Sequence, residues 1–293
     1  MDASDILKRI RKIEITTRNI VNEIFSGEYH SLFKGQGLEF SEVREYQLGD
    51  SYRQIDWNVS AKTGSPHIKI FSETRELNVI FAVDCSASTL FGTEKYLKSE
   101  LITEITAVLA FSAISNNDKV GLLLFSDKIE KYIPPHKGKK TAMRVLREIL
   151  YHQPQSKKTN INTAVKYLYT LLNKRSIIFL ISDFYTKDYE DDLKILAKKH
   201  DVVAIQIIDS KETELPKVGL INLIDPETGQ TYTVNTLNSS TRALFAKKIS
   251  AEQENLHERF KKIKVDLITL KTSDDYVKVL LKFFKRRTGG KRR

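Results

Sequence analysis

The chain has 293 residues, of which 41% are hydrophobic and 29% charged, and its formal net charge is +11. This composition is typical of folded globular proteins and excludes the disordered class, and the length suffices for a core that buries most of the apolar surface. The longest apolar runs, residues 77–83 and 176–181, have the length of strands and fall far short of the ~20 residues that cross a bilayer.

The N-terminus and the cysteine content indicate the cellular compartment. The first nine residues interleave charged with apolar side chains and lack the continuous hydrophobic segment of a signal peptide, so we expect a cytoplasmic protein. The single cysteine, Cys85, excludes an internal disulfide. The six histidines are scattered without the spacing of zinc ligands, so we expect no zinc site.

Most of the positive charge lies at the C-terminus. Residues 282–293 carry seven basic and no acidic groups, and subtracting 7 from +11 leaves +4 for the rest of the chain. One alternative function is therefore that of an adaptor that binds nucleic acid or an anionic surface through this tail. No stripe of arginine and aromatic residues elsewhere supports that alternative.

The first 76 residues are predicted to form an N-terminal helix and a small β-rich subdomain. Apolar residues recur at helical spacing over residues 4–26, which indicates an amphipathic helix that packs against the body of the protein. Glycines punctuate short β-like segments over residues 33–76. Within that stretch we expect a structural role, in charge-assisted hydrogen bonds that tie the subdomain to the core, for Asp50, Arg53, Asp56 and Trp57.

Strands and helices alternate in the second predicted domain, residues 77–285. Strands are predicted over residues 77–84, 119–125, 129–133, 176–182 and 202–208, and helices over residues 93–116, 138–151, 163–173 and 188–200. A hairpin (220–224 and 231–234), a helix (238–262), a strand (265–270) and a closing helix (274–286) follow. Continuous apolar strands between helices predict an α/β fold with a doubly wound, mostly parallel sheet. Residues 286–293 are the basic tail.

Polar side chains follow two strands of this predicted sheet. Asp84, Ser86 and Ser88 come at the end of the first strand, Asp183 follows the strand over residues 176–182, and Thr159 lies in a polar loop that opens a helix. Ligands of open parallel sheets bind beyond the carboxyl ends of the strands, where strand order reverses, so these groups should converge. Oxygen donors suit Mg²⁺ or Mn²⁺, whereas Ca²⁺ usually recruits more carboxylates. Taken singly, each residue has the alternative role of a helix cap.

This pattern resembles the metal-ion-dependent adhesion site of von Willebrand factor A domains. The resemblance implies that Ser86, Ser88 and Thr159 supply hydroxyl oxygens to the ion, that Asp84 and Asp183 act mainly through bound water, and that an open coordination position accepts a carboxylate from a partner. Two positions depart from the family pattern: Lys157 and Lys158 precede Thr159 where the family often has glycine, and Phe184 follows Asp183 in place of the common glycine.

Upstream motifs narrow the resemblance to one family. Gly37-Leu38-Glu39-Phe40, Arg44-Glu45-Tyr46, Gly49-Asp50 and residues 53–57 resemble the bacterial domain of unknown function 58 family, which contains a von Willebrand factor A-like domain. The segments 120–126 and 181–184 extend the similarity over most of the chain. The resemblance implies a protein-binding adaptor that works beside a MoxR-type AAA+ ATPase in protein maturation, metal insertion or stress tolerance.

Motifs of enzymes are weak by comparison. Gly138-Lys139-Lys140-Thr141 lacks the upstream glycine of a phosphate loop, and no Gly-x-Ser-x-Gly elbow occurs. We therefore expect no enzyme, with a magnesium-dependent hydrolase that uses Ser86 as the remaining alternative. Lys157 and Lys158 are placed to steer an acidic partner toward the metal, which favours binding over catalysis.

Overall fold

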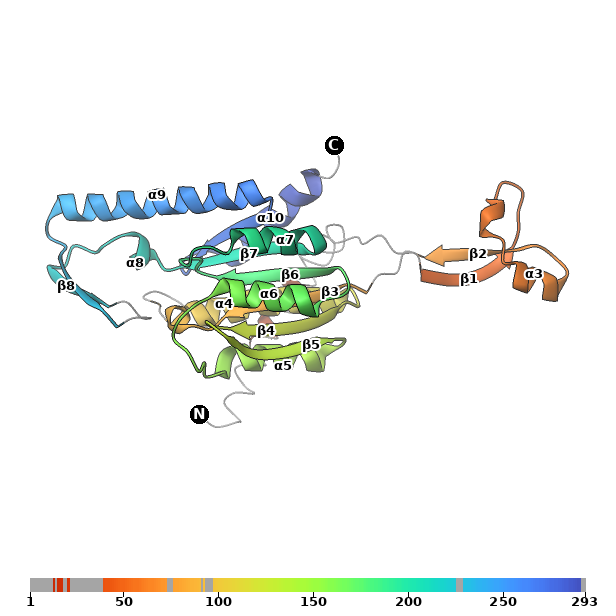
Figure 1. The fold of residues 1–293 in the computed structure, drawn as a ribbon, viewed down its shortest axis with the longest axis horizontal. Coiled ribbons are helices and arrows are strands. Elements are labelled where there is room, and N and C mark those ends of the chain that lie inside the picture. Colours follow the sequence, from red (N-terminus) through yellow and green to blue (C-terminus); the bar gives the residue numbers. More distant parts are fainter. Residues whose placement is uncertain are drawn as a thin grey trace. The chain divides into compact units, whose positions relative to one another are not determined.

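A computed structural model describes residues 13, 15–17, 20–21, 39–72, 76–90, 92, 97–224 and 229–290 (Figure 1). The chain divides into two compact units: residues 33–77 form the smaller, and residues 1–32 together with 78–293 form the larger.

The smaller unit is built on a two-stranded antiparallel sheet. Strand β1 (Glu39–Glu45) pairs with β2 (His67–Ser72), and the 3-10 helix η2 (Tyr52–Gln54) and helix α3 (Trp57–Thr63) lie between them in the chain. Helix α3, which the sequence analysis did not predict, begins where the Asp56 carboxylate accepts hydrogen bonds from two backbone amides. It ends at Gly64, whose φ of 77° is left-handed.

The four residues expected to be structural in this unit divide into two kinds. Asp50 accepts two hydrogen bonds of 2.8 Å from the guanidinium of Arg44, and Asp56 caps α3. Arg53 is exposed, and Trp57 is 72% exposed. The two carboxylates therefore hold the local fold, whereas the large aromatic side chain does not contribute its surface to a core.

The larger unit contains a six-stranded sheet in the order β10-β7-β6-β3-β4-β5. Its strands are β3 (Asn78–Asp84), β4 (Lys119–Phe125), β5 (Ile129–His136), β6 (Ser176–Ser182), β7 (Asp201–Ile208) and β10 (Asp266–Lys271). All neighbours are parallel except β4 and β5. All seven residues of β6 are buried, as a strand covered on both faces requires. This arrangement confirms the predicted doubly wound, mostly parallel fold.

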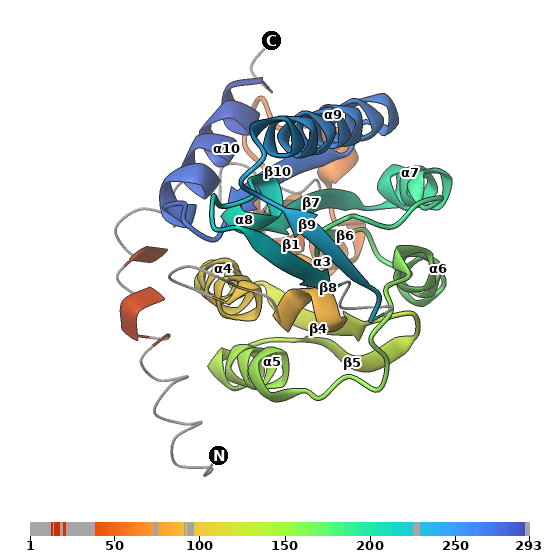
Figure 2. The ribbon, with the colours of Figure 1, turned by 90° about the vertical axis from the view of Figure 1, so that its left-hand side faces the viewer.

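Helices cover both faces of the sheet (Figure 2). One face carries α4 (Lys98–Ser115), α5 (Lys139–Tyr151) and α10 (Tyr276–Gly290), and the other carries α6 (Ile161–Leu171), α7 (Glu190–Lys199) and α9 (Ser239–Ile263). The second face forms one large core, in which Ile80, Leu180 and Phe260 are at most 1% exposed. Each buried apolar side chain of this kind contributes roughly 1.5–3 kcal/mol, so the sheet forms a rigid base for its loops.

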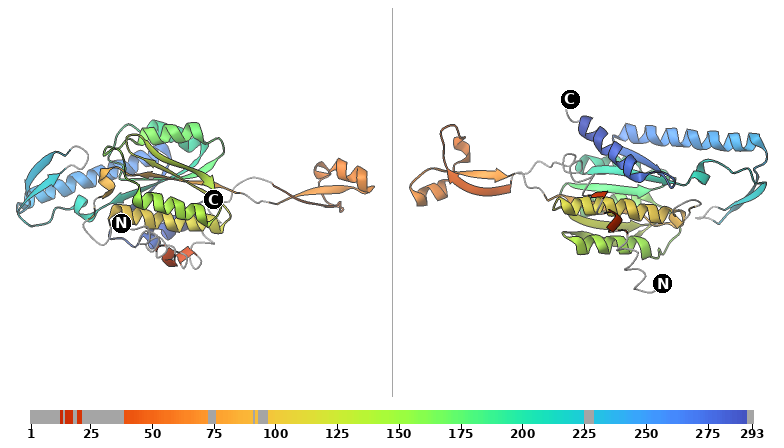
Figure 3. Two further views of the ribbon diagram at one scale, coloured as in Figure 1. Left: turned by 90° about the horizontal axis from the view of Figure 1, so that it is seen from below. Right: turned by 180° about the vertical axis from the view of Figure 1, so that it is seen from behind.

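Two segments extend this core. Strands β8 (Leu220–Ile224) and β9 (Thr231–Asn235) pair as the predicted antiparallel hairpin, which lies beyond the end of the sheet and beside the first turns of α9 (Figure 3). The short helix α8 (Ser210–Thr213) precedes it. The turn residues 225–228 lie outside the described part of the chain.

The predicted terminal segments are described only in part. Most of the predicted helix over residues 4–26 lies outside the described residues, although Ile13 packs against the buried pair Ala107 and Leu146. At the other end, α10 continues to Gly290, beyond the predicted end at residue 286. Arg287 forms ion pairs with Asp201 and Asp266, so this cation of the predicted tail serves the fold. No helix among the described residues is long and apolar enough to cross a membrane.

Candidate metal centre

The carboxyl ends of β3 and β6 form the point where strand order reverses. The chain leaves β3 toward β4 on one side and leaves β6 toward β7 on the other, although β3 and β6 are hydrogen-bonded neighbours. Asp84 is the last residue of β3, and Asp183 directly follows β6. The topology therefore brings together two carboxylates that are 99 residues apart in the sequence.

Asp84 is held rigidly in the interior. It is 1% exposed; its Oδ1 accepts a 2.9 Å hydrogen bond from the backbone amide of Ser86, and its Oδ2 accepts a 2.7 Å hydrogen bond from the Ser182 hydroxyl. Burial, and after it the negative charge of Asp183, raise the pKa of Asp84 from its ordinary 3.8 to about 7. The carboxylate is thus oriented by donors but short of positive charge.

Ser86 and Ser88 present their hydroxyls to each other. The two Oγ atoms are 3.1 Å apart, Ser86 is fully buried, and Ser88 is 9% exposed. The turn that places them is the 3-10 helix η3 (Ala87–Leu90), which is tied back when Thr89 donates from its hydroxyl and its amide to the carbonyl of Ser86. The structure therefore brings Asp84, Ser86 and Ser88 together as the sequence predicted.

The loop that carries Thr159 lies against this turn. The amide of Ala87 donates to the carbonyl of Lys157 at 3.2 Å, and the amide of Asn160 donates to the carbonyl of Ser126 at 3.0 Å. Thr159 is half-buried and stands between these two attachment points. Its loop thus reaches the carboxyl ends of β3 and β4.

A buried carboxylate, Glu130, anchors the start of the loop that carries Thr159. Sequence reasoning missed this residue. Glu130, whose side chain is fully buried, accepts hydrogen bonds from the Ser126 hydroxyl at 2.7 Å and from the Gln155 amide at 3.1 Å. Although burial opposes it, these hydrogen bonds hold the pKa of Glu130 below its ordinary value. Glu130 fixes the start of the loop that leads to Thr159.

Asp183, which directly follows β6, is 5% exposed. Its Oδ1 accepts a hydrogen bond from the Tyr185 amide, and its carbonyl accepts one from the Gln206 side chain. Phe184 has a φ of 60°, the left-handed conformation that glycine adopts without strain. Its ring is buried against Tyr189 and Phe260, so packing offsets the cost of this backbone conformation.

We call five of these residues the oxygen cluster, and they are Asp84, Ser86, Ser88, Thr159 and Asp183. Their donor atoms fit a hard divalent cation. Two buried carboxylates and neighbouring hydroxyls provide oxygen alone, which is the ligand type of magnesium and manganese. Within the described ranges no three His, Cys, Asp or Glu side chains gather as a metal site, so hydroxyls would have to complete the shell of any ion bound here. Cys85 is no candidate, because its thiol donates to the Phe125 carbonyl and burial raises its pKa.

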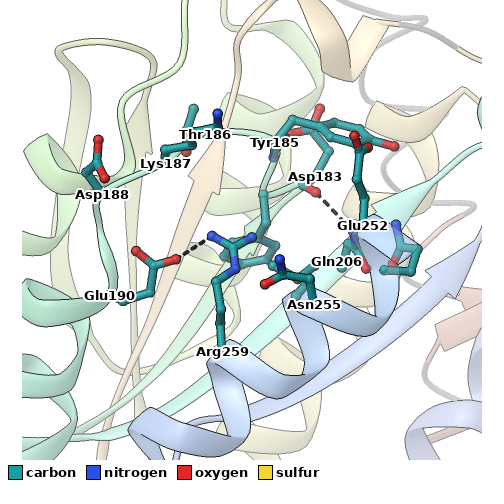
Figure 4. A pocket seen from close by; sticks show the side chains of 13 residues that line it. Asp183, Tyr185, Thr186, Lys187, Asp188, Glu190, Gln206, Glu252, Asn255 and Arg259 are labelled. Carbon is teal, nitrogen blue, oxygen red and sulfur yellow. Dashed lines mark hydrogen bonds and ion pairs between the residues drawn. The ribbon is translucent and has the colours of Figure 1, made fainter. Parts of the chain in front are cut away.

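A polar pocket adjoins the oxygen cluster at Asp183 (Figure 4). It has a volume of about 640 Å³ and lies between the segment Asp183–Glu190 and helix α9. Across it, Arg259 of α9 forms an ion pair with Glu190. Sequence reasoning missed this pocket, since its two walls are more than 60 residues apart in the chain and share no motif.

Two mycobacterial proteins are similar to this chain in sequence. An uncharacterized protein of Mycobacterium tuberculosis is 27% identical over 293 residues, which cover 99% of this chain and 92% of the relative. An uncharacterized protein of Mycobacterium avium is 28% identical over 161 residues, covering 54% of this chain and 95% of the relative.

Solved structures with some likeness have low sequence identity. The conserved hypothetical protein BatB from Bacteroides thetaiotaomicron is 18% identical with a TM-score of 0.47, covering 73% of this chain and 99% of that one. Proximal thread matrix protein 1 from the mussel byssus, solved with a zinc-occupied MIDAS motif, is 20% identical with a TM-score of 0.36 and covers 45% and 38% of the two chains.

The family predicted from the motifs is confirmed by a family model described as "Protein of unknown function DUF58", which matches residues 42–255, well over half of the chain. This protein therefore belongs to the DUF58 family.

Proposed function

We propose that this protein is a cytoplasmic, non-enzymatic adaptor that binds a protein partner through a magnesium or manganese ion held by the oxygen cluster. The observation that carries the proposal is the meeting of Asp84 and Asp183, both nearly fully buried, at the reversal point of the sheet. Two buried like charges cost folding free energy unless a cation or a proton neutralises them. A divalent cation supplies that charge.

The roles proposed for the residues follow from the family resemblance and, for Asp84, also from its hydrogen bonds. Ser86, Ser88 and Thr159 would offer hydroxyl oxygens to the ion, whereas both oxygens of Asp84 already accept hydrogen bonds and favour contact through water. This set leaves the ion with little direct negative charge. A carboxylate on the partner would supply it, strongly so in a partly desolvated site.

Binding is favoured over catalysis because the sequence carries neither a phosphate loop nor a Gly-x-Ser-x-Gly elbow. The Ser86 hydroxyl contacts the hydroxyl of Ser88 and the carboxyl of Asp84, and an ion bound there would occupy these oxygens. The alternative that depends on the basic tail is weakened by Arg287, which pairs with two carboxylates of the fold.

The family resemblance makes a MoxR-type AAA+ ATPase the partner to test first. We propose co-precipitation of the full chain with the MoxR-type ATPase of the same organism, in buffer with EDTA and after magnesium is restored. Capture should fall with the chelator and recover with the metal. It should be lost in Asp84→Ala and Asp183→Ala, with both variants folded by circular dichroism.

A matched control is Asp127→Asn, which removes an exposed carboxylate two residues after β4, at the same edge of the sheet and outside the polar pocket. Capture that ignores the chelator and both cluster variants would refute the metal-dependent mechanism. Capture lost equally in the control would also refute it, because general negative charge would then explain binding.

A further inference from the structure

The pocket beside Asp183 has an apolar floor and polar walls. Phe184 and Leu256, 2% and 3% exposed, lie at its base. The walls come from the segment after β6 and from α9, and in Figure 4 Glu190 of the first wall faces Arg259 of the second. A volume of about 640 Å³ is within the range of small-molecule sites and exceeds what one amino-acid side chain needs.

The charges that line the pocket do not balance. The lining has four carboxylates and two cations. The carboxylates are Asp183, Asp188, Glu190 and Glu252, and the cations are Lys187 and Arg259. Glu190 and Arg259 pair with each other, and Asp183 belongs to the oxygen cluster, where the proposed ion would offset its charge. Two carboxylates, Asp188 and Glu252, therefore remain against one lysine. The pocket therefore has a negative potential that attracts a cation.

Tyr185 and Glu252 both line the pocket, one from each wall (Figure 4). Tyr185 is 47% exposed, so an incoming group can reach its ring as well as the Glu252 carboxylate. A carboxylate beside an accessible aromatic ring suits an ammonium or guanidinium group.

The walls also hold hydrogen-bond capacity that the protein leaves unused. Thr186 Oγ1 and Gln253 Oε1 have no hydrogen-bond partner in the described part of the chain. Both can accept a hydrogen bond, and an ammonium group brings three donors. Unused acceptors next to uncompensated carboxylates favour a cationic occupant over a neutral one.

We propose that this pocket binds a basic side chain, lysine or arginine, of the same partner segment whose carboxylate completes the metal shell. The inference rests on the proposed function, because Asp183 belongs both to the oxygen cluster and to the pocket wall. The partner would then be recognised by an acidic and a basic residue close together, with Glu252 as the main contact for the base.

The pocket can be tested without the partner. The probes are Nα-acetyl-lysine methylamide and two matched analogues, neutral Nα-acetyl-norleucine methylamide and anionic Nα-acetyl-glutamate methylamide, titrated into the full chain by saturation-transfer difference NMR. The lysine probe should bind at a saturable site and the analogues should bind at least about fivefold more weakly. Glu252→Gln should weaken the lysine probe by about fivefold, whereas Glu254→Gln, an exposed residue of the same helix outside the pocket, should not.

Equal binding of the lysine and norleucine probes, preference for glutamate, or equal effects of the two glutamine variants would overturn the inference. Calorimetric titration with magnesium separates it from the proposed function. A chain that binds magnesium but not the lysine probe disproves the pocket assignment alone, and one that binds the probe but not magnesium disproves the metal-dependent function alone.

Discussion

Replacing Asp84 with asparagine should stabilise the metal-free protein while it abolishes magnesium binding. Asp84 is 1% exposed and lies close enough to Asp183 that the second charge raises its pKa. Asparagine keeps the shape of the side chain and can still accept from the Ser86 amide. Its amide group would donate to the Ser182 hydroxyl, which must then reverse its own hydrogen bond.

The magnitude follows from the pKa of Asp84. The folded metal-free protein holds this proton up to about pH 7, whereas the unfolded chain gives it up near pH 3.8, so the free energy of unfolding falls as the pH rises between these values. A tenfold change in an acid constant is worth about 1.4 kcal/mol, which sets an upper limit of about 4 kcal/mol above pH 7. The altered hydrogen bond takes back about 1 kcal/mol. We expect a net gain of roughly 1–3 kcal/mol.

Thermal unfolding at pH 8 measures this gain. Without metal, Asp84→Asn should melt several degrees above the wild type, since about 2–4 °C corresponds to each kcal/mol in a domain of this size. With magnesium, the wild type should gain stability and the variant should not. A variant that melts below the metal-free wild type would refute the argument that the buried charge is uncompensated.

The apparent affinity for magnesium should fall by up to about tenfold per pH unit below the Asp84 pKa of about 7, because protons compete with the ion for this carboxylate. Calorimetry between pH 8 and pH 6 measures this affinity. An affinity that stays constant would contradict the role of Asp84 at the metal site. Gly121→Ala should lower the free energy of unfolding in urea by about 1–3 kcal/mol, since a Cβ there would lie 2.8 Å from the Ile133 carbonyl oxygen. An unchanged urea midpoint would show that β5 moves away to make room for the methyl group. Asp56→Ala should lower the melting temperature by removing the cap of α3, and unchanged melting would show that other contacts hold this helix.

The sheet could be predicted because its strands are apolar on both faces. The segments 119–125 and 176–182 were predicted at the bounds that the structure shows, since each is a continuous apolar run between polar residues. Helix α3 was missed because its seven residues have no buried side chain and thus no apolar period. The end of α10 was placed too early, because the ion pairs that Arg287 makes are tertiary contacts that leave no local pattern.

The site could be predicted only as far as chain order reveals it. Asp84, Ser86 and Ser88 share one turn, and Asp183 directly follows a neighbouring strand, so topology alone places them together. Glu130 gave no signal, since its partners Ser126 and Gln155 meet it only after folding. The pocket between the β6–α7 segment and α9 also gave no signal, because its two walls are distant in the sequence and meet only after folding.

The most direct test of the central claim is a calorimetric titration of the metal-stripped full chain with magnesium chloride. Wild type and Ser250→Ala, an exposed serine of α9, should each bind one ion per chain at the oxygen cluster, and Ser86→Ala should bind none. If all three proteins bind magnesium alike, or if the wild type binds no ion, the account of this site as a metal-dependent binding centre is wrong.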